Sequence, residues 1–183
     1  MLYFAYGSNI DVERMKNRGV IFSQRVRAVL KGYVLKFNKT SASAGEGYAN
    51  IDPNKGGNVE GALYTIPDSD IIKLDRFEGY PLHYDRVLMQ VQLEGDQVVE
   101  ATVYVAQPSK VKEGLRPTRK YINHLLAGRD ILSPSYYRKL EGLKTLQSWG
   151  ASAKASEITK APELRDTKLN WRMVCSMRVR TIE

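Results

Sequence analysis

The chain has 183 residues, of which 43% are hydrophobic and 26% charged, and its 28 Lys and Arg outnumber 20 Asp and Glu to give a formal net charge of +8. These proportions are typical of a globular chain of one domain, and they exclude a disordered protein; no apolar run approaches the ~20 residues that span a bilayer, so we expect no membrane partner. The single cysteine, Cys175, excludes an intrachain disulfide, and with only His83 and His124 beside it we expect no structural metal.

An apolar, aromatic segment at the start of the chain predicts a buried strand over residues 2–6. The turn formers Gly7, Ser8 and Asn9 follow, and the acidic residues within 11–15 favour the first turn of a helix. The loop therefore lies between a strand and a helix. The start lacks the basic flank and the small-residue cleavage site of a signal peptide, so we expect a cytoplasmic location.

The next part of the chain is expected to be rich in strands. Residues 26–37 mix apolar side chains with Lys and Arg and predict strand segments that turn at Gly32. The Gly, Ser and Ala residues within 40–47 predict a mobile loop. Residues 48–51 and 59–66 are predicted strands, which the turn formers between them join into a hairpin.

A short helix is predicted after the capping residues at 67–70, and Gly79 is placed to end it. Glu78 therefore falls at the end of this helix. We expect the helix to bury three apolar side chains: Ile71, Leu74 and Phe77.

Period-two alternation predicts two strands, 84–93 and 98–106, across a turn at 94–96. Proline and hydroxyl residues then open two helices, one from Pro117 to Leu126 and one from Ser133 that carries apolar residues at helical spacing to Leu146. The predicted order is thus a sheet-rich body followed by two helices.

The composition changes near residue 150, which predicts a domain over 1–149 and a C-terminal extension over 150–183. Alternation over 171–180 predicts one strand in this extension. Such a strand could pair with a sheet edge or with a second copy of the chain, so a homodimer is possible.

The first strand and its loop carry a specific motif, Leu-Tyr-Phe-Ala-Tyr-Gly-Ser-Asn at residues 2–9. It closely resembles the γ-glutamylcyclotransferase-like family (γ-glutamylcyclotransferase, γ-glutamylamine cyclotransferase and AIG2-like proteins), whose first strand runs into a substrate-binding Tyr-Gly-Ser-Asn loop. The resemblance implies an α+β fold, a small mixed β-barrel with flanking helices. Glycine in such a turn allows backbone N–H groups to point at an anion, so the loop could hold a carboxylate or an oxyanion. The implied substrate-binding residues are Tyr3, Phe4, Ala5, Tyr6, Gly7, Ser8 and Asn9.

A second motif, residues 74–79 with Tyr84 beyond them, is similar to the family segment in which a glutamate before a glycine is the catalytic acid/base. The matching residue is Glu78, and the resemblance implies that Tyr84 lies at the substrate site. Neighbouring aromatic residues predict a partly desolvated setting that suits proton transfer near neutrality. We interpret Asp75, one helical turn earlier, as a solvated partner or a helix charge.

Two further tyrosines match the family pattern. Tyr104 lies in a late strand that resembles the family strand with an inward tyrosine, and Tyr121 lies in a Pro-x-x-x-Tyr setting where the family has a substrate contact. Both are candidate substrate-binding residues, although a buried tyrosine in a core or a wall needs only some hydrogen-bond partner.

The resemblance implies a reaction on a small γ-glutamyl substrate. The α-amine attacks the γ-carbonyl of the same molecule and releases 5-oxoproline and an amine or amino acid, with Glu78 moving the proton. Residues 40–47 are expected to set the leaving group. Ser8 lacks a Gly-x-Ser-x-Gly elbow and is interpreted as a binding residue. The loop lacks the Walker A and dinucleotide fingerprints, so no cofactor is expected.

Two alternatives stay open. The leaving group could be a side-chain-linked lysine, a glutathione-like peptide or an acyl-carrier adduct, with the same catalytic residues. The chain could instead be a binding module on the same fold, which contacts nucleic acid or a protein through its basic surface and tail without catalysis. Lys and Arg occur in singles and pairs with no run of five, which favours a solvated surface over a nucleic-acid partner.

Overall fold

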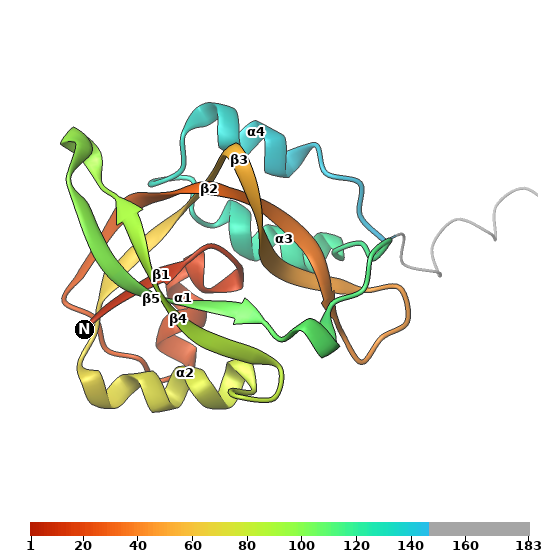
Figure 1. Cartoon of the computed structure of the whole chain (residues 1–183), viewed down its shortest axis with the longest axis horizontal. Coiled ribbons are helices and arrows are strands. Elements are labelled where there is room, and N and C mark those ends of the chain that lie inside the picture. Colours follow the sequence, from red (N-terminus) through yellow and green to blue (C-terminus); the bar gives the residue numbers. More distant parts are fainter. Residues whose placement is uncertain (147–183) are drawn as a thin grey trace, which may run out of the picture. The chain divides into compact units, whose positions relative to one another are not determined.

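A computed structural model describes residues 1–146 of the chain. The predicted extension 150–183 and its strand lie outside the described residues. The described part is built on a closed five-stranded barrel in the order β1-β3-β2-β4-β5, with helices against its outside (Figure 1). The predicted fold class, an α+β fold with a small mixed barrel and flanking helices, is therefore confirmed. No helix within these 146 residues is long and apolar enough to cross a membrane.

Strand β1 (Leu2–Ala5) closes the barrel, because it pairs antiparallel with β3 and parallel with β5. It has neighbours on both sides, so its last three residues are buried. The chain then passes through the 3-10 turn η1 (Ser8–Ile10) into helix α1 (Val12–Asn17). Asp11 caps this helix by accepting hydrogen bonds from the N–H groups of Glu13 and Arg14, at 3.0 and 3.4 Å. The predicted order of strand, loop and helix is confirmed.

The two longest strands, β2 (Gln24–Thr40) and β3 (Gly47–Thr65), pair antiparallel along most of their length. The predicted hairpin between 48–51 and 59–66 is wrong, because both halves of β3 pair with β2. The turn formers at 54–57 form a bulge opposite Gly32 instead of reversing the chain. The turn predicted at Gly32 is also wrong, because β2 continues through this residue. Gly32, at φ 81°, lies at the register shift between β2 and β3.

Helix α2 (Ile71–Glu78) follows the 3-10 turn η2 (Asp68–Asp70) and ends as predicted at Gly79, whose φ of 66° is the left-handed conformation of a helix C-cap. Ile71 and Leu74 are buried, but the prediction for Phe77 is wrong: this residue is 56% exposed. The guanidinium of Arg18 lies 4.6 Å from the centre of its ring. Phe77 therefore packs against a cation and not in the core.

Strands β4 (Tyr84–Gln92) and β5 (Val98–Ala106) are the two predicted strands, and they pair antiparallel across the short turn η3 (Glu94–Asp96). A further short turn, η4 (Pro108–Lys110), follows β5. In the view of Figure 1, β4 and β5 form the green ribbons and α2 runs below the barrel strands.

Helices α3 (Arg119–Leu126) and α4 (Pro134–Glu141) begin as predicted after the N-caps Thr118 and Ser133. Helix α4 ends at Glu141, before the predicted apolar positions at Leu143 and Leu146. The two helices pack together around a small apolar cluster that also takes in the end of η1. The buried members of this cluster are Ile10, Leu125, Leu132, Tyr136 and Leu140. This packing holds α3 beside the Gly7–Ser8 loop.

Candidate active site

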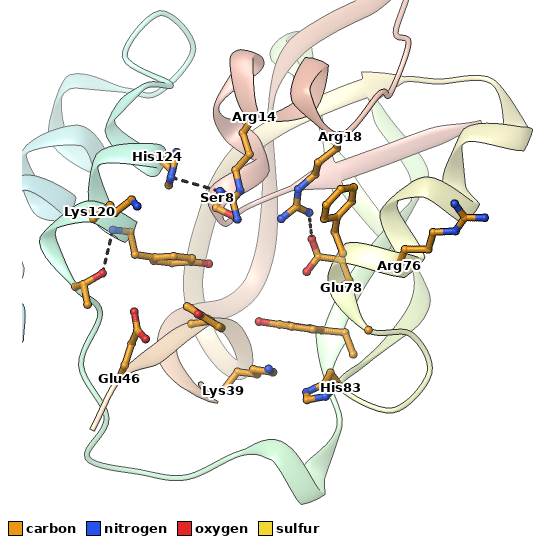
Figure 2. A pocket seen from close by; sticks show the side chains of 16 residues that line it. Ser8, Arg14, Arg18, Lys39, Glu46, Arg76, Glu78, His83, Lys120 and His124 are labelled. Carbon is orange, nitrogen blue, oxygen red and sulfur yellow. Dashed lines mark hydrogen bonds and ion pairs between the residues drawn. The ribbon is translucent and has the colours of Figure 1, made fainter. Parts of the chain in front are cut away.

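A cavity of about 640 Å³ opens where the loop after β1, the C-terminal end of α2 and the N-terminal part of α3 meet (Figure 2). Its walls are mostly polar and aromatic. The lining residues are Ser8, Arg14, Arg18, Lys39, Glu46, Tyr48, Arg76, Phe77, Glu78, Gly79, His83, Tyr84, Thr118, Lys120, Tyr121 and His124. The two regions that the sequence motifs marked, the Gly-Ser loop and Glu78, therefore share one cavity.

Glu78, the last residue of α2, has a side chain that is 16% exposed. Its Oε1 accepts a hydrogen bond from Arg18 Nη1 at 2.6 Å and another from Asn9 Nδ2 at 3.1 Å. Neither contact involves Oε2. The carboxylate is thus fixed through one oxygen, by a charge-assisted bond from α1's C-cap and by an amide from the loop.

Asn9 connects Glu78 to Tyr3 in β1, because its Nδ2 also donates to the Tyr3 hydroxyl at 2.7 Å. Burial, with the nearby Glu78 charge as the next cause, raises the pKa of Tyr3 far above its ordinary value. Tyr3 therefore stays protonated. Asn9 Oδ1 is buried and has no hydrogen-bond partner within residues 1–146, which is uncommon for a buried acceptor.

Tyr104 in β5 donates its hydroxyl hydrogen to Asp75 Oδ1 at 2.8 Å. The Asp75 side chain is 15% exposed and also lies 3.5 Å from Arg86 Nε. Of the two interpretations of Asp75, the solvated partner is therefore wrong, because its carboxylate is a largely buried acceptor on α2. The pKa of Tyr104 lies far above its ordinary value, chiefly because of burial and then because of this bond to Asp75.

Tyr84 and Tyr121 both bond to the backbone of Ala49 in β3. The Tyr84 hydroxyl donates to the Ala49 carbonyl at 2.8 Å, and the Ala49 N–H donates to the Tyr121 oxygen at 3.1 Å. Burial raises the pKa of Tyr121 to about 12, and donors from Ala49 and Ser8 oppose this rise. A Cβ on Gly7 would lie 3.2 Å from the Tyr121 oxygen, so glycine allows this ring to approach the loop.

A second, smaller hollow of about 30 Å³ lies at the end of the barrel beside Glu78. The predicted substrate-binding residues line it with a single exception, and Ala49 and Glu78 complete the wall. The predicted residues in the wall are Tyr3, Phe4, Tyr6, Gly7, Ser8, Asn9, Tyr84, Tyr104 and Tyr121. Ala5 is the exception, since it is packed in the core against Ala62 of β3. The roles of all these residues in binding stay predictions.

Sequence reasoning missed the cations and histidines of the larger cavity. Figure 2 shows Arg14 and Arg18 on one side in that view, and Lys39 and His83 on the other, with Glu78 between them. Positive charge on Lys39, followed by burial, lowers the pKa of His83. In the sequence these residues look like ordinary surface charges, and only their place next to the loop or the α2 end could have marked them.

Contacts among the side chains of Asp11, Arg14 and His124 join α1 to α3. His124 Nδ1 lies 2.7 Å from Asp11 Oδ2, and its Nε2 lies 3.4 Å from Arg14 Nη1. These two contacts hold together the helices that flank the Gly7–Ser8 loop. Within residues 1–146 no three His, Cys, Asp or Glu side chains come together as a metal site.

The closed barrel with its flanking helices has the fold of the γ-glutamylcyclotransferases. A solved structure titled gamma-glutamyl cyclotransferase has the same fold, with a TM-score of 0.72 and 24% identity over 84% of this chain and 94% of that one. The human protein loc79017 is similar at a TM-score of 0.72, with 25% identity over 84% of this chain and 93% of that one.

The model of the family described as gamma-glutamyl cyclotransferase, AIG2-like, matches residues 3–123, and the chain belongs to this family. Among curated relatives, YkqA of Bacillus subtilis, which is named provisionally as a γ-glutamylcyclotransferase, is 31% identical over 144 residues. That match covers 76% of this chain and 50% of YkqA, so the chain spans about half the length of this relative.

Proposed function

We propose that the chain is a γ-glutamylcyclotransferase-type enzyme, which converts a γ-glutamyl peptide or amine to 5-oxoproline and the free amino acid or amine. The observation that carries the proposal is the setting of Glu78. Its carboxylate is largely buried, is held through Oε1 by Arg18 and Asn9, and borders both the cavity and the hollow beneath the Gly7–Ser8 loop. Family membership supports the same reaction.

The reaction is an intramolecular acyl transfer. The substrate's α-amine attacks its γ-carbonyl, a C–N bond forms within the new ring, and the original C–N bond to the leaving amine breaks. Glu78 takes one proton from the α-ammonium, which frees the amine for attack, and returns it to the leaving nitrogen as the original C–N bond breaks. The attacking nitrogen also loses a second proton as the ring closes, and the departing amine takes up this proton and leaves as an ammonium, so protons balance without an external reactant. Because nucleophile and electrophile belong to one molecule, holding the glutamyl chain folded supplies much of the acceleration.

The oxyanion that develops on the γ-carbonyl needs nearby donors. The backbone N–H groups of Gly7 and Ser8 are the candidates, since this loop lines the hollow next to Glu78. Ser8 is then a binding residue and not a nucleophile, and no covalent intermediate forms.

The α-ammonium of the substrate needs acceptors as well as a base. Asn9 Oδ1 is a buried acceptor without a partner among residues 1–146, and it belongs to the residue that already bonds to Glu78. An ammonium placed between this oxygen and the Glu78 carboxylate would satisfy both groups. The hollow of about 30 Å³ has room for only a few atoms, so the rest of the substrate extends into the larger cavity.

The experiment is to measure 5-oxoproline release from a panel of γ-glutamyl dipeptides and γ-glutamyl amines with the wild-type chain and Glu78→Gln. Glu100→Gln is the matched control, because Glu100 is an exposed residue of β5 that lines neither the cavity nor the hollow. Release by the wild type and by Glu100→Gln, but not by folded Glu78→Gln, supports the proposal. Release from no member of the panel rejects it and favours a binding module.

A further inference from the structure

Lys39 is a buried cation in the wall of the cavity. It lies near the end of β2 opposite Tyr48 in β3, and the residue is only 6% exposed. Its Nζ lies 5.4 Å from the ring centres of both Tyr48 and Tyr84. Two aromatic faces thus attract the ammonium without neutralising it.

Lys39 has no carboxylate partner within residues 1–146, unlike the buried guanidinium groups of Arg18 and Arg25. Arg18 and Arg25 have side chains that are 8% exposed, and they pair with Glu78 and Asp130. No ion pair among residues 1–146 includes Lys39. Burial lowers the pKa of Lys39, an effect that the Glu78 charge opposes. A lysine is rarely buried without a counter-ion, so this position favours an anion that the substrate brings.

The net positive charge of the cavity also favours an anionic group on the substrate. Five Lys and Arg line it against two glutamates, and Arg18 and Glu78 neutralise each other. Glu46 is then the one remaining negative charge against four positive charges in the lining, those of Arg14, Lys39, Arg76 and Lys120. The glutamyl part of the substrate carries one ammonium and one carboxylate and so has no net charge. The surplus positive charge is therefore available to the leaving group.

The position of Lys39 separates it from the reacting atoms. Glu78 and Ser8 line both the hollow and the larger cavity, whereas Lys39 lines only the larger cavity. With the reacting carbonyl at the loop, Lys39 faces the part of the substrate outside the hollow.

We propose that Lys39 binds an anionic group, such as a carboxylate, on the leaving amine, and that the enzyme selects γ-glutamyl compounds with negatively charged leaving groups. This inference rests on the proposed function. It identifies Lys39 as a specificity-determining residue that does not take part in proton transfer.

A matched pair of substrates tests the inference: γ-glutamylalanine and γ-glutamylalaninamide, which differ only in a carboxylate replaced by a carboxamide. For the wild type, kcat/KM should be about tenfold to a hundredfold higher for the carboxylate, the usual worth of one charge-assisted hydrogen bond. Lys39→Met should reduce this ratio to near one and change kcat/KM for the amide by no more than about threefold. Lys39→Arg keeps the charge and should retain part of the preference.

Lys139→Met is the control, since Lys139 is an exposed residue of α4 outside the cavity, and its ratio should equal that of the wild type. Equal wild-type kcat/KM for the two substrates overturns this inference and leaves the proposed function intact. An equal loss on both substrates in Lys39→Met overturns it in favour of a contact with the glutamyl α-carboxylate. If the wild type releases 5-oxoproline from neither substrate and from no other γ-glutamyl compound, the proposed function is rejected, and this inference with it.

Discussion

Arg18 Nη1 lies 2.6 Å from Glu78 Oε1, and this ion pair joins the end of α1 to the end of α2 inside the cavity. The two side chains are 8% and 16% exposed, so little solvent screens the pair. The sequence places these residues 60 positions apart, and the barrel brings them together. Arg18 is therefore a positioning residue for the proposed base.

Arg18→Met should lower kcat by about tenfold or more with little change in KM, because Glu78 would lose the donor that orients it. Steady-state kinetics at a temperature where circular dichroism shows a folded protein measures this split. Arg18→Lys keeps the charge without the planar guanidinium and should recover part of kcat. A rise in KM with kcat unchanged would show instead that Arg18 binds substrate.

Tyr104→Phe should lower the free energy of unfolding by about 1–2 kcal/mol, because Asp75 Oδ1 would lose a buried donor. Urea denaturation measures the change. Tyr33→Phe is the control, since Tyr33 is a half-buried residue of β2, and its effect should be smaller. Equal effects of the two substitutions would mean that the Tyr104–Asp75 bond contributes nothing specific to stability.

Gly61 in β3 has no room for a side chain, because a Cβ there would lie 2.3 Å from the Ala5 carbonyl oxygen and 2.9 Å from the Phe4 ring. Gly61→Ala should therefore push β1 away from β3 and lower the free energy of unfolding by about 1–3 kcal/mol or more. Thermal or urea unfolding is the measurement. The matched control is Gly142→Ala, whose added Cβ would meet its nearest neighbour at an ordinary 3.5 Å, and which should be close to neutral. A neutral Gly61→Ala would contradict the close packing of β1.

The His83 imidazole should titrate below its ordinary value of 6.5, because the positive charge of Lys39, followed by burial, disfavours the imidazolium form and lowers the pKa. Lys39→Met removes that charge, so the pKa of His83 should rise toward 6.5. Nuclear magnetic resonance titration follows the ring signals, and the chain has only one other histidine. Lys110→Met should cause a smaller rise of the same sign, since Lys110 is the weakest of the three causes. A fall in the pKa of His83 in Lys39→Met would contradict this electrostatic account.

The regions of the candidate site that short motifs mark could be predicted from the sequence. The Gly-Ser loop follows a strand whose last three residues are buried, and Glu78 precedes a glycine that ends a helix. Local propensity and capping determine both features, so the pattern of neighbouring residues is enough to find them. The alternation of apolar and polar residues predicted the bounds of β4 and β5 to within one residue, because this pattern is also a local property of the sequence.

Features that depend on distant contacts could not be predicted. Turn formers within β3 indicated a hairpin, but a bulge opposite Gly32 accommodates them while β2 pairs with both halves of the strand. Asp75 looked like a surface charge because its partner Tyr104 lies 29 positions away. Lys39 and Arg18 resembled the other basic residues, because burial and pairing are properties of the closed barrel and not of local sequence.

In the proposed reaction, Glu78 moves the proton during 5-oxoproline formation. The most direct test is the kcat of Glu78→Gln, compared with the wild type on the best γ-glutamyl substrate, because glutamine keeps the size of the side chain and removes the base. We expect kcat to fall by about 10²- to 10⁴-fold with little change in KM, as for the loss of a general acid/base in a folded enzyme. A kcat within about threefold of the wild-type value would contradict the account and remove Glu78 from the chemistry.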